Sequence, residues 1–148
     1  MSDFGMSDLD KKMTRLAACI AKNADKKVAA IAIGIVQQEV QETPVDTGRA
    51  KANWQANVGF PVFDAIEAQP PGVGGSTAGA NQAFAEHSAT ARIANFKPSD
   101  QAIFITHNLD YIGPLNQGHS AQNDPGWIER AMADGILLAK DIKLTECK

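Results

Sequence analysis

The segment from Asp8 to Glu42 contains no proline, and apolar side chains return along it every three or four residues. This spacing gathers them in one stripe on a 3.6-residue helical period. The stripe comprises Leu9, Met13, Leu16, Ile20, Ala24, Val28, Ile31 and Ile35. Ser7 is a suitable N-cap residue, and Pro44 prevents a simple continuation. We therefore predict a helix over about 8–42, which either crosses the domain or projects toward a neighbour.

Length and composition limit what can surround this helix. The 148 residues suit a single domain, 1–148. The chain holds 24 alanines but only nine aromatic residues, so each residue has little apolar area to bury and the core should be thin. A net charge of -3 argues against a protein that grips nucleic acid by its backbone.

Apolar stretches, the N-terminal segment and the cysteines indicate the compartment and the redox state of the chain. The longest apolar stretch, Val28 to Val36, is about half the roughly 20 residues that a bilayer span needs. The acidic segment 1–10 has no signal-peptide pattern, so we expect synthesis in the cytosol and no membrane partner. Cys19 and Cys147 lie near opposite ends of the chain, and we expect both thiols to be reduced and unpaired.

A turn and an alternating segment follow the first helix. Thr43 to Arg49 contains proline, aspartate and glycine in an order that favours a turn. Over 50–58, apolar and polar residues then alternate strictly, which is typical of a half-buried strand. Trp54 would be the large anchor of its inner face.

A proline- and glycine-rich arm, about 60–76, comes next. Loops of this length in compact domains tend to be functional or disordered. The arm carries Phe63 and Ile66, which either dock on a partner or fold back over the chain's own core. The remaining predicted elements are a helix over about 78–95, a central strand over 102–106, an irregular segment over 108–125 and a last helix over about 126–144.

The sequence offers little catalytic chemistry. His87, His107 and His119 stand on different elements, so we predict no metal site. The segment 71–77 lacks the lysine of a phosphate loop, and we predict no cofactor. A small soluble enzyme whose site combines His107, Tyr111 and His119 remains one alternative.

Two segments resemble the neck and tail-completion proteins of tailed bacteriophages, also described as head–tail joining proteins or minor tail components. The first, Thr43–Gln55, reads TPVDTGRAKANWQ and is similar to the family's turn into a strand that ends in tryptophan. The second, Thr106–Ile112, reads THNLDYI and is followed by Leu115, Gly118, Ser120 and Pro125-Gly126. Asp110, Asn116-Gln117 and Asp124 depart from the family pattern.

The resemblance implies an α+β fold, with a small, mostly antiparallel sheet packed against a long N-terminal helix and a C-terminal helix. It also implies a non-catalytic virion protein at the head–tail junction, assembled as a ring, expected to be a hexamer, around the DNA channel. DNA would pass without specific binding, and the partners would be other neck, connector and tail-tube proteins. The interface or structural candidates are Asp46, Thr47, Gly48, Arg49, Trp54, Phe63, Ile66, Tyr111 and Gly118.

Other functions stay open from sequence. Within the same junction, the chain could be a tail terminator or a head-completion stopper. Outside it, the chain could be the enzyme described above, or an assembly chaperone absent from the finished particle. A virion protein would reside in the host cytoplasm only during assembly.

Overall fold

The computed structural model describes residues 3–148, and the protein is α+β as predicted. A single long helix, α1, precedes a small two-stranded sheet and four further helices. In chain order the elements are α1 (Asp3–Glu42), α2 (Arg49–Ala52), β1 (Trp54–Val58), α3 (Ala78–Ile93), the 3-10 turn η1 (Pro98–Asp100), β2 (Ile103–His107), α4 (Ile112–Asn116) and α5 (Trp127–Leu138).

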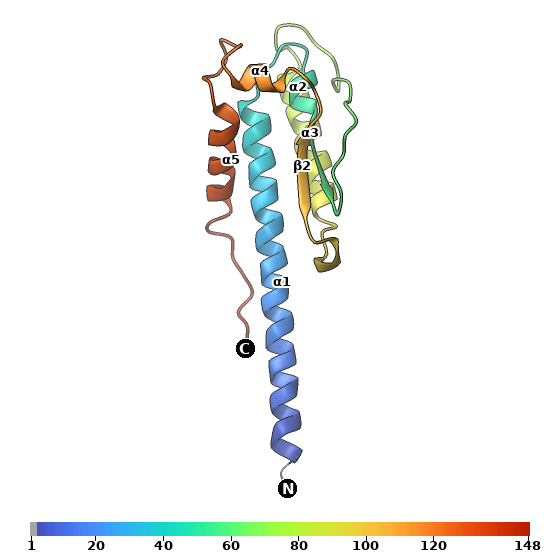
Figure 1. The fold of residues 1–148 in the computed structure, drawn as a ribbon, viewed down its shortest axis with the longest axis vertical. Coiled ribbons are helices and arrows are strands. Elements are labelled where there is room, and N and C mark those ends of the chain that lie inside the picture. The colour runs from blue at the N-terminus through green and yellow to red at the C-terminus, as the bar shows by residue number, and fades with distance from the viewer. Residues whose placement is uncertain (1–2) are drawn as a thin grey trace.

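Helix α1 is the spine of the molecule (Figure 1). Its C-terminal half lies between α5 on one side and the sheet with α3 on the other, while its N-terminal half projects away from the domain. Strands β1 and β2 are antiparallel, with Trp54 opposite His107 and Val58 opposite Ile103. The short helix α4 crosses the end of the domain opposite the N-terminus.

The core is thin, and two tryptophans dominate it. Trp127 is fully buried, and its ring meets that of Trp54 edge to face at 6.5 Å. Their indole N–H groups donate to Leu115 O at 3.1 Å and to Thr43 Oγ1 at 2.7 Å respectively. Small side chains fill the remaining space, among them Ala32, Val36, Val40, Ala56, Ala85 and Ala89. The expected role of Trp54 as an inner anchor agrees with its burial.

Helices α1 and α5 touch backbone to backbone at two glycines. A Cβ atom on Gly34 would collide with the carbonyl oxygen of Gly135, and one on Gly135 would collide with the backbone of Ile35. Gly34 is therefore required by close packing, although it weakens the isolated helix.

This contact corrects the predicted face of α1 and determines the buried face of α5. On α5 the buried residues are Trp127, Ala131 and Gly135, whereas the larger Met132 and Ile136 are exposed. Small residues face α1 because the backbones lie so close. On α1 the buried residues are Ala32, Gly34, Val36, Glu39 and Val40, while Leu9, Met13, Leu16, Ile20 and Val28 of the predicted stripe are exposed.

Several predicted boundaries were also wrong. Helix α1 begins at Asp3, so Ser7 is not its N-cap. Residues 49–52 form α2 rather than a strand, because Gly48 enters the left-handed region (φ 90°) and the alanines that follow favour helix. Strand β2 has one neighbour and is not central. The expected irregular segment 108–125 contains α4, and α5 ends at Leu138.

The two cysteines form a disulfide, and the expectation of free thiols was wrong. After α5 the chain runs back along α1 (Figure 1), which brings the Cα atoms of Cys19 and Cys147 to 5.7 Å. Asn23 pairs with the backbone of Thr145 in both directions, at 2.6 and 2.8 Å. Lys26 and Lys27 donate to tail carbonyls, including that of Ala139. The tail is therefore fastened to the near end of the projecting helix.

One charged residue sits inside the core. Glu39 of α1 is 1% exposed, and no described group hydrogen-bonds its Oε2 atom. Burial, and secondarily the carboxylate of Glu129, raises the pKa of Glu39 from 4.5 to about 8. The side chain is therefore protonated at neutral pH in the folded protein.

We predict that Gly135→Ala destabilises the fold by about 1–3 kcal/mol, because the new methyl group must push α5 away from α1. Chemical denaturation measures the change. Gly79→Ala in α3 is the matched control: no atom lies within 4 Å of its added Cβ, so a gain of about 0.5–1 kcal/mol is expected. Equal effects at both positions would contradict the close contact.

We predict that stability falls as pH rises from about 6.5 to 8, because the folded chain holds the Glu39 proton that the unfolded chain releases. Between about pH 4.5 and 6.5 the effect of Glu39 is offset by His107, which binds a proton in the unfolded chain but not in the folded one. The loss over that interval from pH 6.5 to 8 should be on the order of 2 kcal/mol. Glu39→Gln should flatten this slope and exceed the wild type in stability at pH 8. Glu129→Gln should keep most of the slope, since burial is the larger cause. A wild-type slope unchanged by Glu39→Gln would contradict the assignment.

Candidate functional site

The turn predicted after α1 holds the far end of the arm. Asp46 accepts hydrogen bonds from Gly74 N through its carboxylate and from Gly75 N through its carbonyl, both at 2.8 Å. Thr47 O accepts from Gly72 N at 2.9 Å. Any side chain at Gly48 would collide with Asn81, besides the strain of its positive φ. These residues are therefore structural in the single chain.

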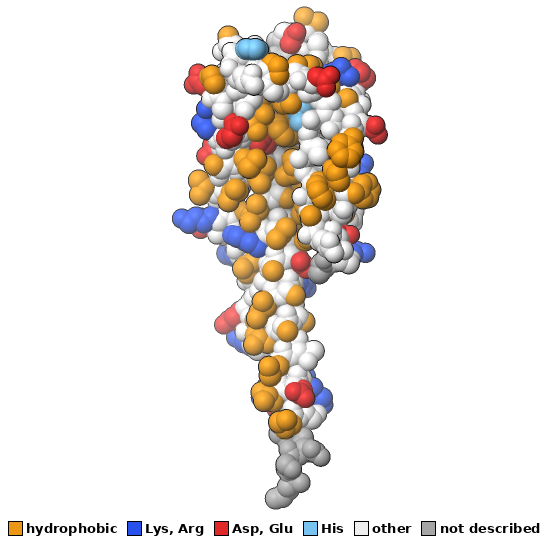
Figure 2. Space-filling view, in the orientation of Figure 1, with side chains coloured by type: hydrophobic (Ala, Val, Ile, Leu, Met, Phe, Trp, Pro, Cys, Tyr) orange, Lys and Arg blue, Asp and Glu red, His pale blue; other side chains and the backbone are white. Residues whose placement is uncertain are grey.

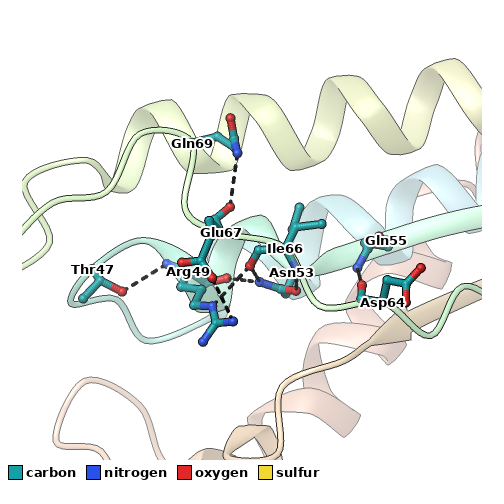
Figure 3. Close-up of polar contacts among 8 residues, drawn as sticks. All are labelled: Thr47, Arg49, Asn53, Gln55, Asp64, Ile66, Glu67 and Gln69. Atoms are coloured by element: carbon teal, nitrogen blue, oxygen red, sulfur yellow. Dashed lines mark hydrogen bonds and ion pairs between the residues drawn. The ribbon is translucent and has the colours of Figure 1, made fainter.

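The near end of the arm is held by Asn53, which is fully buried (Figure 3). Its side-chain amide donates to Ile66 O and accepts from Ile66 N, both at 2.8 Å. Arg49 adds a bond from Nε to Ile66 O at 3.2 Å and an ion pair with Glu67 at 3.1 Å. The arm thus follows the second course left open by the sequence and folds back over its own domain.

A second buried amide, Asn81 of α3, fastens the middle of the arm. Its Oδ1 accepts from Gln69 N at 2.5 Å and its Nδ2 donates to Pro70 O at 2.8 Å. The arm still displays apolar surface: Phe63 is 79% exposed, and Phe60 is also exposed. Ile66 instead lines a small cavity of about 150 Å³ beside Trp54 and Phe84. Of the two arm residues singled out from sequence, only Phe63 points to solvent.

The two segments that carry the family resemblance meet at one end of the domain. Gln122 pairs with both backbone groups of Val45, accepting from its N–H at 2.8 Å and donating to its carbonyl at 2.9 Å. Asn123 donates to Glu42 O at 2.8 Å. An open cavity of about 310 Å³ lies between residues 44–50 and residues 111–122. It is lined by Pro44, Val45, Asp46, Thr47, Gly48, Ala50, Tyr111, Leu115, His119, Ser120 and Gln122.

Tyr111 and Gly118 belong to this second segment. Tyr111 is partly exposed at the cavity, and burial of its ring raises the pKa of the phenol. Gly118 has a φ of 97°, and a Cβ there would lie 2.8 Å from the ring of Pro125. Nearby, Gly126 N donates to Asn116 O at 2.7 Å. The turn that leads into α5 therefore requires Gly118.

One of the two histidines of the enzyme hypothesis, His107, lies apart from this cavity. His107 packs edge to face on Trp54 at 4.8 Å, and its Nε2 bonds Ala50 O at 2.8 Å. Burial lowers the pKa of His107 to about 4, although the bond to Ala50 acts in the opposite direction. Tyr111 and His119 line the cavity, but His107 does not. The three groups proposed for an enzyme do not converge there.

The comparisons with known proteins found no match: no family model, no curated protein and no solved structure matches this chain. Within residues 3–148, no cluster of three or more His, Cys, Asp or Glu side chains could hold a metal ion. No helix in that part of the chain is long and apolar enough to cross a membrane.

We predict that Asn53→Ala loosens the arm and costs about 2–3 kcal/mol, because the backbone groups of Ile66 lose their partners. Chymotrypsin should then cleave after Phe63 several-fold faster; the bond after Phe60 is protected because Pro61 follows it. Gln55→Ala is the matched control, since it removes one bond, to Asp64 O, at the surface. Unchanged cleavage of the Asn53 variant would show that the arm is held by other contacts.

Proposed function

We propose that this chain is a structural protein of the tailed-bacteriophage neck, assembled as a ring around the DNA channel. The observation that carries the proposal is the junction between its two family-like segments. Asp46 of the first segment lines the same cavity as Tyr111 of the second and Ser120, which follows it. Gln122 lies between Ser120 and Pro125 and pairs with both backbone groups of Val45. The residues that carry the resemblance thus form one structural unit in the fold.

Two exposed apolar regions support a role in assembly. Phe60 and Phe63 stand out from a part of the arm whose backbone is held by Asn57, Thr106 and Asn108, which donate to the carbonyls of Phe60, Val62 and Asp64. On α5, the close contact with α1 turns larger side chains outward, namely Met132, Ile136, Leu137 and Leu138. Exposed apolar patches of this kind mark protein contacts. Ring interfaces are head to tail and need two different surfaces on each subunit.

The charge also suits a DNA conduit. A net charge of -3 gives DNA no overall electrostatic attraction to the subunit. In this proposal DNA passes without specific binding, and the contacts are made with other copies and with connector and tail-tube proteins. The virion is then the site of action.

The first test of the proposal is antibody labelling of purified phage particles, viewed by electron microscopy. We expect label confined to the head–tail junction. Label absent from intact particles, with the protein present in infected cells, would overturn the virion role and favour an assembly chaperone.

A second test uses the arm. Phe63→Ser should reduce incorporation of the protein into particles at least about tenfold, because an interface side chain is lost. Val73→Ser is the matched control, since Val73 is equally exposed, at 83%, but lies at the other end of the arm. Both variants should keep the wild-type melting temperature. Normal incorporation of the Phe63 variant would remove the arm from the interface.

A further inference from the structure

The C-terminal tail, residues 139–148, lies against α1 where the projecting half of that helix leaves the domain (Figure 1). It contains no helix or strand, and of residues 140–148 only Ile142 and Cys147 are partly buried. The hydrophobic cluster of the core, together with the residues packed against it, falls within 29–128. The tail is therefore joined to α1 outside the core, and its contacts can open without unpacking the domain.

Hydrogen bonds alone are a weak hold on this tail. Asn23 pairs with the backbone of Thr145, Lys26 donates to Lys143 O at 2.6 Å, and Lys27 donates to two further carbonyls. Water competes for such exposed bonds, so one bond returns about as little free energy as the ordering of one residue costs. The bonds from α1 are fewer than the nine residues 140–148. The disulfide changes this balance, because it confines the tail between α5 and Cys19.

The tail is also the support of the projecting helix. Residues 6–18 are all exposed, and this part of α1 stands clear of the domain as a narrow stalk (Figure 2). Most of the stability of helices in proteins comes from tertiary packing. The tail supplies packing at Cys19, Asn23 and Lys27, which lie between the stalk and the core-contacting part of α1. Without the tail, packing against α1 would begin only at about Ala29.

We propose that the Cys19–Cys147 bond is a redox switch that controls the order of the tail and of the projecting half of α1. When the bond is closed, the tail stays on α1 and supports it as far as Cys19. When a dithiol reductant opens the bond, residues 140–148 detach and α1 frays back toward Ala29. The domain keeps its own core and stays folded in both states.

The opening step is thiol–disulfide exchange. A thiolate of the dithiol attacks one cysteine sulfur, the sulfur–sulfur bond breaks, and the other cysteine leaves as a thiolate. The second thiol of the reductant then displaces the first cysteine from the mixed disulfide. The reductant ends as a disulfide, and Cys19 and Cys147 together gain two electrons and two protons. Both cysteines are partly exposed, so a reductant can reach them.

The switch does not depend on the proposed neck function, but the two together give it a timing. Thiols are kept reduced in the cytosol, whereas disulfides persist outside cells. A neck protein would therefore be assembled with a free tail, and the tail would close on α1 after the particle is released. This timing rests on the proposed function; the switch itself is a property of the single chain.

Hydrogen–deuterium exchange of the purified full chain, with and without dithiothreitol, tests the proposal. We expect the amides of residues 20–28 and of Thr145 to exchange at least about tenfold faster after reduction, because their hydrogen bonds then open locally. The amides of α3 and β1 should exchange at an unchanged rate. Oxidised glutathione should restore the slow exchange, because it reforms the bond.

A double variant, Cys19→Ser with Cys147→Ser, separates the bond from the reagent. It should exchange as the reduced wild type does and should not respond to dithiothreitol. Asn23→Ala in the disulfide-bonded chain is the matched control, because it removes the hydrogen bonds to Thr145 and leaves the bond in place. Its residues 20–28 should stay within about twofold of the oxidised wild type.

Three results would overturn the proposal. Equal exchange of residues 20–28 in both states would show that the bond does not control the helix. Loss of the near-ultraviolet circular dichroism of Trp54 and Trp127 on reduction would show that the bond holds the whole fold. A bond that dithiothreitol opens only in denaturant would show that reductants do not reach it. All three leave the neck proposal standing, since labelling of particles tests that separately.

Discussion

The backbone contact between Gly34 of α1 and Gly135 of α5 is the constraint on which the rest of the fold depends. It sets the distance between the two helices, and that distance admits only small side chains at the crossing. Trp127, at the start of α5, is thereby carried to the centre of the core, where it meets Trp54. The same contact turns Ile136 and Leu138 outward. One close approach thus determines both the core and part of the exposed apolar surface.

The sequence predicted the elements better than their faces. The periodicity of α1 and the punctuation by Pro44 were sufficient for a long helix, but alanine and glycine are compatible with either face. Periodicity counts apolar side chains, whereas the buried faces were chosen by size. The prediction of a strand over residues 50–52 was wrong for a related reason. Alternating alanines satisfy a strand pattern but favour a helix. The disulfide was missed because nothing local in the sequence indicates that the tail turns back along α1.

The sequence likewise predicted only part of the candidate site. The turn at Asp46, Thr47 and Gly48 could be predicted because proline, aspartate and glycine act locally. The partners of that turn could not, since they lie 28 residues away and are backbone groups of the arm. Asn53 and Asn81 were missed although both are fully buried. Asn53 was expected on the polar, outer face of the predicted strand and Asn81 within a helix, so neither position gave a signal. Each amide is buried because it satisfies backbone groups of the arm.

The amide clamps give the arm a property that matters for assembly. A loop that must order itself on binding loses conformational entropy at that moment, which weakens the contact. Here Asn53, Asn81 and Asp46 fix the later part of the arm beforehand. Thr106 and Asn108 hold the residues on either side of Phe63, so Phe63 is presented from an ordered segment.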